Sequence, residues 1–250
     1  MAFEFPKVFF VSGTDTGVGK TVLSAMLCLG LEAHYWKPIQ SGGKDIKGCL
    51  QDLNGADPDD FTDSSFMRLA GISPENILPE RFRLSQPLSP HLSARLDGIN
   101  ISISDFALPD ITSMKHLIIE GAGGLLVPIN ERELIVDLIA QFDLPVLLAA
   151  RSGLGTINHT LLSLSALKAR KLKTLGVVMI GPSSEENRKA IEQFGSVKVI
   201  AQIPILETIN RDTLTRCFHE HFSPGESKHE TRQADNLAPV HADAQLHSRP

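Results

Sequence analysis

Close-spaced cysteines are missing from this chain of 250 residues, which has three cysteines in all, at Cys28, Cys49 and Cys217. An odd number without a close pair argues against a disulfide framework or a zinc knuckle and favours a reducing cytosol. An excess of positive charge is missing too. The formal net charge is −5, whereas a general nucleic-acid binder is usually basic.

Two kinds of hydrophobic segment are also missing. No apolar run approaches the roughly 20 residues that span a bilayer. The N-terminus has no basic region followed by an apolar one, which is the pattern of a signal peptide. We therefore expect a soluble, cytoplasmic protein with neither a nucleic acid nor a membrane as its partner. The length fits one ordinary α/β domain or two small ones.

Short apolar runs alternate along the chain with longer amphipathic segments. The runs are apolar throughout, which predicts strands that are buried on both faces. The expected strands are Val8–Ser12, Tyr35–Ile39, Leu117–Glu120, Val146–Ala150, Leu175–Ile180 and Val197–Ala201. The expected helices are Lys20–Ala33, Asp60–Ala70, Glu133–Gln141, Thr156–Arg170, Glu185–Phe194 and Arg211–Phe222. This alternation predicts an α/β fold in three Rossmann-like layers, a parallel β-sheet with helices on both faces. Ligands would then bind at the carboxyl ends of the strands.

The last stretch of the chain differs in composition from the rest. Residues 223–250 have no aromatic residue and few large aliphatic ones. Such a segment cannot bury enough surface to offset the entropy of ordering it. We therefore expect a single domain over residues 1–222 and a disordered polar tail over 223–250. The tail contains histidines, but their irregular spacing favours a solvated tail over a metal site.

A glycine-rich turn follows the first expected strand, in the sequence FFVSGTDTGVGKTVLS. A phosphate-binding loop needs converging backbone N–H groups, a helix N-terminus behind them and a lysine for the outer phosphates. Gly17 and Gly19 permit a close backbone approach, and Lys20 supplies the charge. The hydroxyl of Thr21 can bind Mg²⁺.

One position of this loop departs from the usual spacing. The residue six places before the lysine is normally glycine, but it is Thr14 here, and Gly13 stands one place early. The preceding strand and the following helix are nevertheless the required context. We interpret the stretch as a nucleotide-binding P-loop of an unusual type rather than as a chance glycine-rich turn.

Two further expected strands end in charged residues. Lys37 lies at the end of the second strand in HYWKPIQSG, and the proline after it fixes the backbone where the chain leaves the sheet. Glu120 ends a strand before Gly-Ala-Gly-Gly, as the metal-binding carboxylate of a Walker B strand does. Asp63 lies near a helix start, where capping the helix is its ordinary role. Each residue alone is weak evidence, and Glu120 together with Thr21 is much stronger.

These pieces together resemble the dethiobiotin synthetase family of P-loop enzymes. The resemblance rests on GTDTxVGKT, on YxKPxxSG, on TDS before a helix, and on EGAGG after an apolar strand. It extends to LSPHLSA at Leu88–Ala94 and to GLGTINHT at Gly153–Thr160, and it covers roughly Phe9 to Leu206. The family's loop sequence accounts for the early position of Gly13.

The resemblance implies an ATP- and Mg²⁺-dependent reaction of biotin synthesis. In it, 7,8-diaminopelargonic acid and CO₂ form dethiobiotin, with release of ADP and phosphate. Lys20 and Lys37 would be catalytic and would bracket the γ-phosphoryl group. Thr21, Asp63 and Glu120 would hold the Mg²⁺. The nucleotide site would comprise Gly17, Val18, Gly19, Lys20, Thr21, Val22, Asp63, Glu120, Gly121, Ala122, Gly123, Pro204, Ile205 and Leu206.

The resemblance also implies a homodimer whose subunits share the diamine substrate. Thr16 and Ser41 would position its diamine end. Its distant carboxylate would meet a helix N-terminus of the partner subunit, formed here by Gly155, Thr156, Ile157 and Asn158. From the residues alone, Asn158 could equally be an ordinary residue on a helix surface.

Base recognition departs from the family pattern. The family often has an asparagine that reads the adenine edge, where this chain has Ile180 or Gly181. Neither side chain can hydrogen-bond a base. The backbone of the loop Ile203–Thr208 could serve instead, so the sequence leaves nucleotide selectivity open.

Two other classes of P-loop protein share this fold. Partitioning or septum-positioning ATPases are regulatory switches with an extra lysine early in the loop, but Gly13–Thr16 contains none. They also often end in a basic or amphipathic membrane helix, a pattern that residues 223–250 lack. A cobyrinate-type amidoligase would be favoured by a glutamine amidotransferase domain. An inert nucleotide-binding module is the remaining alternative.

Overall fold

The computed structural model describes residues 3–42 and 61–222 of the chain. The polar tail expected over 223–250 therefore lies outside the described residues, as do Cys49 and the expected first helical residue, Asp60. The other two cysteines, Cys28 and Cys217, are buried free thiols.

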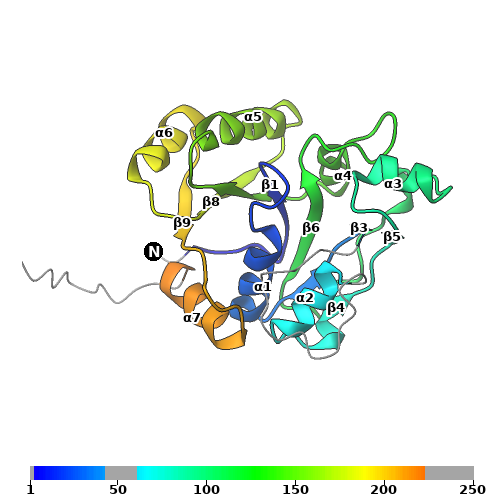
Figure 1. Ribbon diagram of the computed structural model, residues 1–250, viewed down its shortest axis with the longest axis horizontal. Helices are drawn as coiled ribbons and strands as arrows, with labels where there is room; N and C mark the ends of the chain where they lie inside the picture. The colour runs from blue at the N-terminus through cyan, green and yellow to red at the C-terminus, as the bar shows by residue number, and fades with distance from the viewer. Residues whose placement is uncertain (1–2, 43–60, 223–250) are drawn as a thin grey trace, which may run out of the picture.

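The described part of the chain forms a seven-stranded sheet in the order β4-β2-β6-β1-β7-β8-β9 (Figure 1). All of its paired strands run parallel. The strands are β1 (Val8–Gly13), β2 (His34–Trp36), β4 (Ile77–Leu78), β6 (Leu117–Gly124), β7 (Val146–Arg151), β8 (Thr174–Ile180) and β9 (Val199–Ile203). The predicted parallel α/β fold is confirmed.

Helices cover both faces of this sheet, as Figure 1 shows. One layer contains α1 (Lys20–Leu31), α2 (Asp63–Leu69) and α7 (Arg211–Phe222). The other contains α3 (Pro90–Leu96), α4 (Ile135–Phe142), α5 (Thr156–Ala169) and α6 (Glu185–Gly195). Two short 3₁₀ turns, Pro74–Asn76 and Ile103–Asp105, lie in the connections. None of the described helices combines the length and the hydrophobicity needed to cross a membrane.

Successive residues of each strand face two separate hydrophobic cores. Phe9 and Val11 of β1 pack in the core that includes α1 and α7, whereas Phe10 packs in the core that includes α4 and α5. Side chains alternate across a strand, so both sets must be apolar when both faces are covered. This double burial accounts for the continuous apolar runs of the sequence.

The single strand expected over Tyr35–Ile39 is wrong. β2 ends at Trp36, and the chain resumes as β3 (Ile39–Ser41), which pairs with β5 (Phe82–Leu84) in a separate two-stranded sheet. Pro38 lacks the N–H that a central strand needs, and its carbonyl instead accepts from the N–H of Phe82. The interruption leaves Lys37 just beyond the end of β2.

The remaining differences concern short elements and element ends. The sequence did not predict β4, β5 or α3, which have two, three and seven residues and thus little periodicity to detect. The start of α2 is Asp63 rather than residue 60, and β9 lies two residues later than expected. The helices expected from Lys20, Thr156, Glu185 and Arg211 begin at those residues.

Candidate active site

The loop between β1 and α1 is held by glycines at positions where a side chain would be strained or would collide. Gly17 and Gly19 have φ angles of 71° and 92°, in the left-handed region that favours glycine. A Cβ atom on Gly13 would lie 2.7 Å from Cγ2 of Val18, because the loop folds back over the strand end. The early glycine of the sequence is therefore a packing requirement of this loop.

Hydrogen bonds from neighbouring residues fix the loop in place. The ammonium group of the buried Lys20 donates to the carbonyl of Asp15 at 3.0 Å. The Asp15 carboxylate accepts from the N–H of Thr16 at 2.7 Å and from the guanidinium of Arg151 at 3.1 Å. Arg151 stands at the end of β7 and also donates to the carbonyl of Thr16. The loop is thus tied to the adjacent strand as well as to α1.

Three charged side chains meet where β2 ends beside the middle of β6. Nζ of Lys37 lies 2.7 Å from Oδ2 of Asp63 and 3.3 Å from Oε1 of Glu120. All three side chains are buried. The register explains the meeting, because Trp36 pairs with Ile119, so that Lys37 and Glu120 follow at neighbouring positions. Residues far apart in the sequence thereby form one buried ionic cluster.

The charges of this cluster keep Lys37 protonated. Burial alone would lower the pKa of Lys37, but the nearby carboxylates of Asp63 and Glu120 outweigh it and raise that pKa above its ordinary value. One ammonium group then faces two carboxylates. The cluster favours a further cation, and Lys37 is suited to neutralise an anion rather than to accept a proton.

Asp63 is not the cap of its helix. The N-cap of α2 is Thr62, whose side chain accepts from the N–H of Ser65, and Asp63 is the first helical residue. The N–H of Asp63 donates to the side-chain oxygen of Gln40 at 3.3 Å. The carboxylate of Asp63 is therefore available for the ionic cluster, and capping does not explain this residue.

The hydroxyl of Thr21 joins the same cluster from the P-loop side. It donates to the carboxylate of Asp63 and lies 3.0 Å from Oε1 of Glu120. No group of three or more His, Cys, Asp or Glu residues suited to a metal occurs within residues 3–42 and 61–222. Two carboxylates and a hydroxyl fit Mg²⁺, which takes hard oxygen ligands and fills its remaining positions with water and phosphate oxygens.

The glycines after Glu120 bring β6 alongside the P-loop. β6 continues through Gly121 and Ala122 to Gly124, which pairs with Gly13 of β1. Gly123 has a φ of 72°, and a Cβ atom there would lie 3.6 Å from the hydroxyl oxygen of Thr16. The backbone of this segment thus lies beside the residue expected to contact the diamine.

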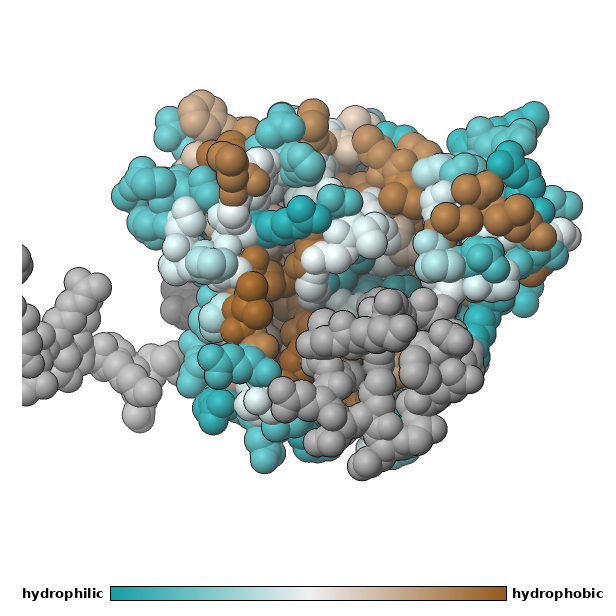
Figure 2. Space-filling model, viewed as in Figure 1, coloured by the Kyte–Doolittle hydropathy of each residue, from teal (hydrophilic) through white to brown (hydrophobic). Residues whose placement is uncertain are grey.

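A mainly apolar cavity of about 280 Å³ adjoins the other end of the loop. Figure 2 shows hydrophobic residues in the hollow above α7, between β9 and α1. Ile180 packs so closely that a Cβ atom on Gly19 would lie 2.9 Å from its Cδ1. The lining residues are Gly19, Val22, Leu23, Met26, Ile180, Ile203, Pro204, Ile205, Leu206, Glu207 and Ile209. This lining includes the expected Val22 and Pro204–Leu206, but not Gly181.

The residues expected to bind the diamine substrate occupy two separate places. Ser41 ends β3, and its buried hydroxyl has no hydrogen-bond partner among the described residues. The start of α5 lies beyond β7, with Gly155 at a φ of 88°. The hydroxyl of Thr156 donates to the carbonyl of Arg151, so its side chain is engaged internally. No hydrogen bond or ion pair in the described chain joins Ile157 or Asn158 to the ionic cluster.

Sequence reasoning missed two residues that contact the site. Arg151 binds the P-loop, and the hydroxyl of Tyr35 lies 3.1 Å from Oε2 of Glu120. A signal for Tyr35 was present, since it lies two residues before Lys37 in an extended segment, where alternate side chains share a face. Arg151 ends an apolar strand, as other site residues do, but nothing in its sequence context distinguishes it from a solvated arginine.

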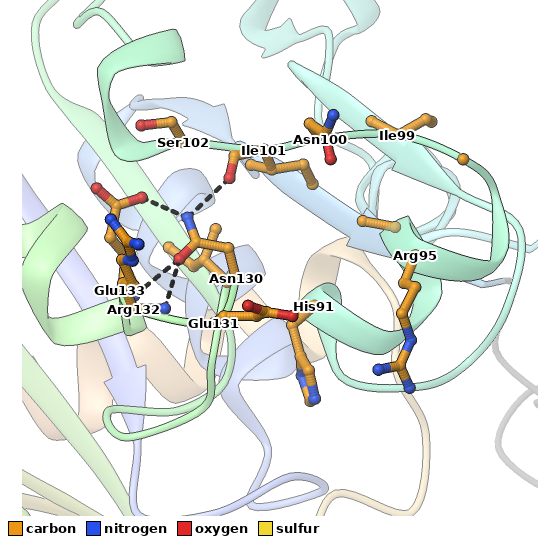
Figure 3. A pocket seen from close by; sticks show the side chains of 13 residues that line it. His91, Arg95, Ile99, Asn100, Ile101, Ser102, Asn130, Glu131, Arg132 and Glu133 are labelled. Carbon is orange, nitrogen blue, oxygen red and sulfur yellow. Dashed lines mark hydrogen bonds between the residues drawn. The ribbon is translucent and has the colours of Figure 1, made fainter.

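A second cavity, of about 620 Å³, lies between α3 and the loop after β6 (Figure 3). Its lining includes His91 and Arg95 from α3 and the segment 129–133. Asn130 holds this segment by donating to the carbonyl of Ile101, as the figure shows. None of the residues expected at the nucleotide or substrate site lines this cavity.

Comparison with known proteins places this site in a family. The AAA domain family matches residues 7–213. The ATP-dependent dethiobiotin synthetase of Brucella ovis is 47% identical over 213 residues, which are 85% of this chain and 92% of that protein. The bifunctional biotin biosynthesis protein BioCD of Bordetella avium is 48% identical over 205 residues. The match covers 82% of this chain but 41% of that longer protein.

Solved structures resemble the chain more distantly. A ParA family ATPase from Chlorobium tepidum superposes with a TM-score of 0.48 at 15% identity, over 87% of this chain and 90% of that one. The family matches and the Brucella relative decide the classification, and they confirm the resemblance that the motifs indicated. The chain belongs to the family of ATP-dependent dethiobiotin synthetases.

Proposed function

We propose that the protein closes the ureido ring of dethiobiotin from 7,8-diaminopelargonic acid and CO₂, with conversion of ATP to ADP and phosphate. The observation that carries this proposal is the buried cluster of Lys37, Asp63 and Glu120 beside the P-loop hydroxyl of Thr21. Such a cluster supports the proposal because it would offer a cation and two carboxylates, able to bind a metal, near the end of a triphosphate bound in the P-loop.

The reaction would begin at one of two neighbouring amines. That amine adds to CO₂, loses a proton and becomes a carbamate. A carbamate oxygen then attacks the γ-phosphorus, the bond to ADP breaks, and a carbamic–phosphoric anhydride forms. The second amine attacks the carbonyl carbon, the carbon–oxygen bond breaks, and phosphate leaves as the ring closes. Each step creates or moves negative charge at one place, so fixed cations there lower the barrier.

Two lysines would supply these fixed cations. Lys20 begins α1, where the helix N-terminus adds its own favourable field for phosphate. Lys37 approaches from β2, remains protonated, and would face both the carbamate and the γ-phosphoryl group. The buried setting strengthens both interactions because little water screens them. Thr16 and Ser41 would orient the amines, and this role is favoured by the buried hydroxyl of Ser41, which has no hydrogen-bond partner within the described part of the chain.

The bound nucleotide would carry Mg²⁺ to the carboxylates. Thr21, Asp63 and Glu120 would hold the ion together with phosphate oxygens and water. When bound, Mg²⁺ would neutralise charge on the transferring phosphoryl group. The ammonium of Lys37 contacts the same two carboxylates, so it lies beside the residues that would hold the ion and could neutralise an anionic substrate there.

We further propose that the active form is a homodimer. Leu126, Leu154 and Leu162 are exposed by 57%, 108% and 62%, and they lie near the start of α5 or next to the P-loop. A second copy of the chain would cover this apolar face and bring the N–H groups of Ile157 and Asn158 to the partner's substrate carboxylate.

Replacing Leu162 by Glu should yield monomers in analytical ultracentrifugation and weaken diamine binding more than ATP binding. A monomeric wild-type enzyme with full activity would contradict the shared site.

A labelled-substrate assay tests the proposed reaction directly. The protein is incubated with the diamine, ATP, Mg²⁺ and C¹⁸O₂ in a mixture that contains no carbonic anhydrase. The products are analysed by mass spectrometry. We expect dethiobiotin with one ¹⁸O in its ureido carbonyl and one ¹⁸O in the released phosphate, because a carbamate oxygen moves to phosphorus. Dethiobiotin without label in phosphate would contradict the anhydride route. ATP hydrolysis at the same rate with and without the diamine would instead indicate a switch ATPase.

A further inference from the structure

The structure assigns to Tyr35, the first residue of YxKPxxSG, a role that the motif does not specify, and this inference rests on the proposed metal-binding role of Glu120. We propose that Tyr35 is a positioning residue whose hydroxyl holds one oxygen of the Glu120 carboxylate, so that the other oxygen is directed at the metal and phosphate side of the site. The basis is one buried contact, 3.1 Å from the Tyr35 hydroxyl to Oε2 of Glu120.

The two oxygens of Glu120 have different partners. Oε1 faces the hydroxyl of Thr21 at 3.0 Å and the ammonium of Lys37 at 3.3 Å, whereas Oε2 faces the hydroxyl of Tyr35. A carboxylate group can rotate about the bond that joins it to the side chain, so either oxygen could face the metal side of the site. The Tyr35 donor at Oε2 opposes that rotation, because turning the carboxylate would break this hydrogen bond. The carboxylate then presents Oε1 in a fixed orientation.

The sheet register brings Tyr35 to this position. Tyr35 pairs with Ile118 across the β2–β6 boundary, and Glu120 lies two residues farther along the same face of β6. Such diagonal neighbours are within reach of a large aromatic side chain. The ring of Tyr35 is fully buried in the core beneath α1, so the hydroxyl is delivered from the hydrophobic side of the site. The core itself thereby fixes the carboxylate.

Tyr35 is the donor in this contact. A carboxylate oxygen accepts, and the phenol O–H is the donor of the pair, so the hydrogen bond runs from Tyr35 to Oε2 of Glu120.

The direct test measures Mn²⁺, a paramagnetic substitute for Mg²⁺, binding to the full-length protein with ADP by electron paramagnetic resonance. Tyr35→Phe should weaken Mn²⁺ affinity by about 10- to 100-fold, the usual effect of losing a partner that orients a metal ligand. The affinity for ADP without metal should stay within about twofold of wild type. The Mg²⁺ concentration for half-maximal turnover should rise in parallel.

The neighbouring residue provides a matched control. Trp36→Phe also removes one aromatic hydrogen bond, from the indole to the carbonyl of Pro79, but on the opposite face of β2. It should leave Mn²⁺ affinity unchanged, even if the midpoint of thermal unfolding falls. In a Glu120→Gln background, Tyr35→Phe should have less than about a twofold further effect, since the two residues act as one unit.

The outcomes separate this inference from the proposed function. Unchanged Mn²⁺ affinity in Tyr35→Phe, or an equal loss in Trp36→Phe, would overturn the positioning role while leaving the reaction intact. Wild-type protein that binds no Mn²⁺ with ADP would overturn both the metal site and the role of Tyr35. Weakened Mn²⁺ binding together with no dethiobiotin in the labelled assay would support Tyr35 and contradict the proposed reaction.

Discussion

At the phosphate end of the proposed nucleotide site, charged side chains are buried and paired, whereas the cavity beside Gly19 is lined mainly by aliphatic side chains. Both ends belong to one loop and one helix. Thr21 faces the charged cluster, and Val22 and Met26 line the cavity one and five residues later. The same helix therefore presents two kinds of chemistry.

The difference teaches where affinity and selectivity come from. Fixed charges in a buried site act on the charge that moves during phosphoryl transfer, so the phosphate end governs rate. Aliphatic walls gain free energy from any flat ring that they cover, but they cannot penalise a ring with the wrong polar edge. The cavity would therefore contribute binding with little discrimination. Changes at the two ends should differ in kind as well as in size.

The largest effect is expected from Lys37→Ala at the phosphate end. Loss of one preorganised charge at a reacting centre typically costs ~10²–10³ in rate, so kcat should fall by that factor while ATP affinity changes little. Steady-state kinetics and calorimetric nucleotide titration check both quantities. Lys115→Ala is the control, because Lys115 is an exposed lysine paired with Glu32 and should not matter. Wild-type kcat in the Lys37 variant would remove it from the site.

The size of that loss should not depend on pH across the neutral range. The pKa of Lys37 in the folded protein is raised above its ordinary value of 10.5. The ammonium group therefore contributes its full charge to the site below pH 10.5. That charge is lost only when the pH rises through the raised pKa of the folded protein. The ratio of wild-type to Lys37→Ala kcat should thus stay constant from about pH 7 to about pH 9.5. A ratio that changes with a midpoint in this range would mean that Lys37 acts as a base.

A smaller effect is expected from Gly19→Ala, where the two ends join. The φ of 92° is strained for any L side chain, and the added Cβ atom would lie 2.9 Å from Ile180. A left-handed residue costs roughly 1–2 kcal/mol, which is about 5- to 30-fold in affinity for every nucleoside triphosphate. Fluorescence titration with ATP and GTP checks this. A loss confined to one base would show that Gly19 serves the cavity alone.

Much of the site could be predicted from the sequence because its residues lie at the ends of strands or the start of a helix, where α/β proteins bind ligands. Lys20, Lys37 and Glu120 each follow an apolar run or open a helix, so a parallel sheet must bring them to one edge. The break at Pro38 was not predicted, since periodicity reports burial and not backbone pairing. The role of Tyr35 was not predicted, because an aromatic ring in a core strand is explained by packing alone. Its polar contact depends on the register with β6, which no local pattern specifies.

The smallest effect concerns the base end and most directly tests the comparison. The cavity is lined by Ile180, one of the two residues that stand where the family often has an asparagine, and Glu207 is the one charged residue of its lining within residues 3–42 and 61–222. A site that hydrogen-bonds a base rejects another base because a buried polar group is left unpaired, and aliphatic side chains impose no such cost.

We therefore expect GTP and CTP to support turnover within about tenfold of ATP, a difference of roughly 1.4 kcal/mol. Ile180→Asn should sharpen the preference for one base without changing kcat at saturating nucleotide, because the change is remote from Lys37. Values of kcat/KM for the four nucleoside triphosphates, in wild type and in this variant, decide the matter. A thousandfold preference for ATP in the wild-type enzyme would mean that backbone groups of Ile203–Leu206 read adenine, and the two ends would then differ in their side chains but not in their selectivity.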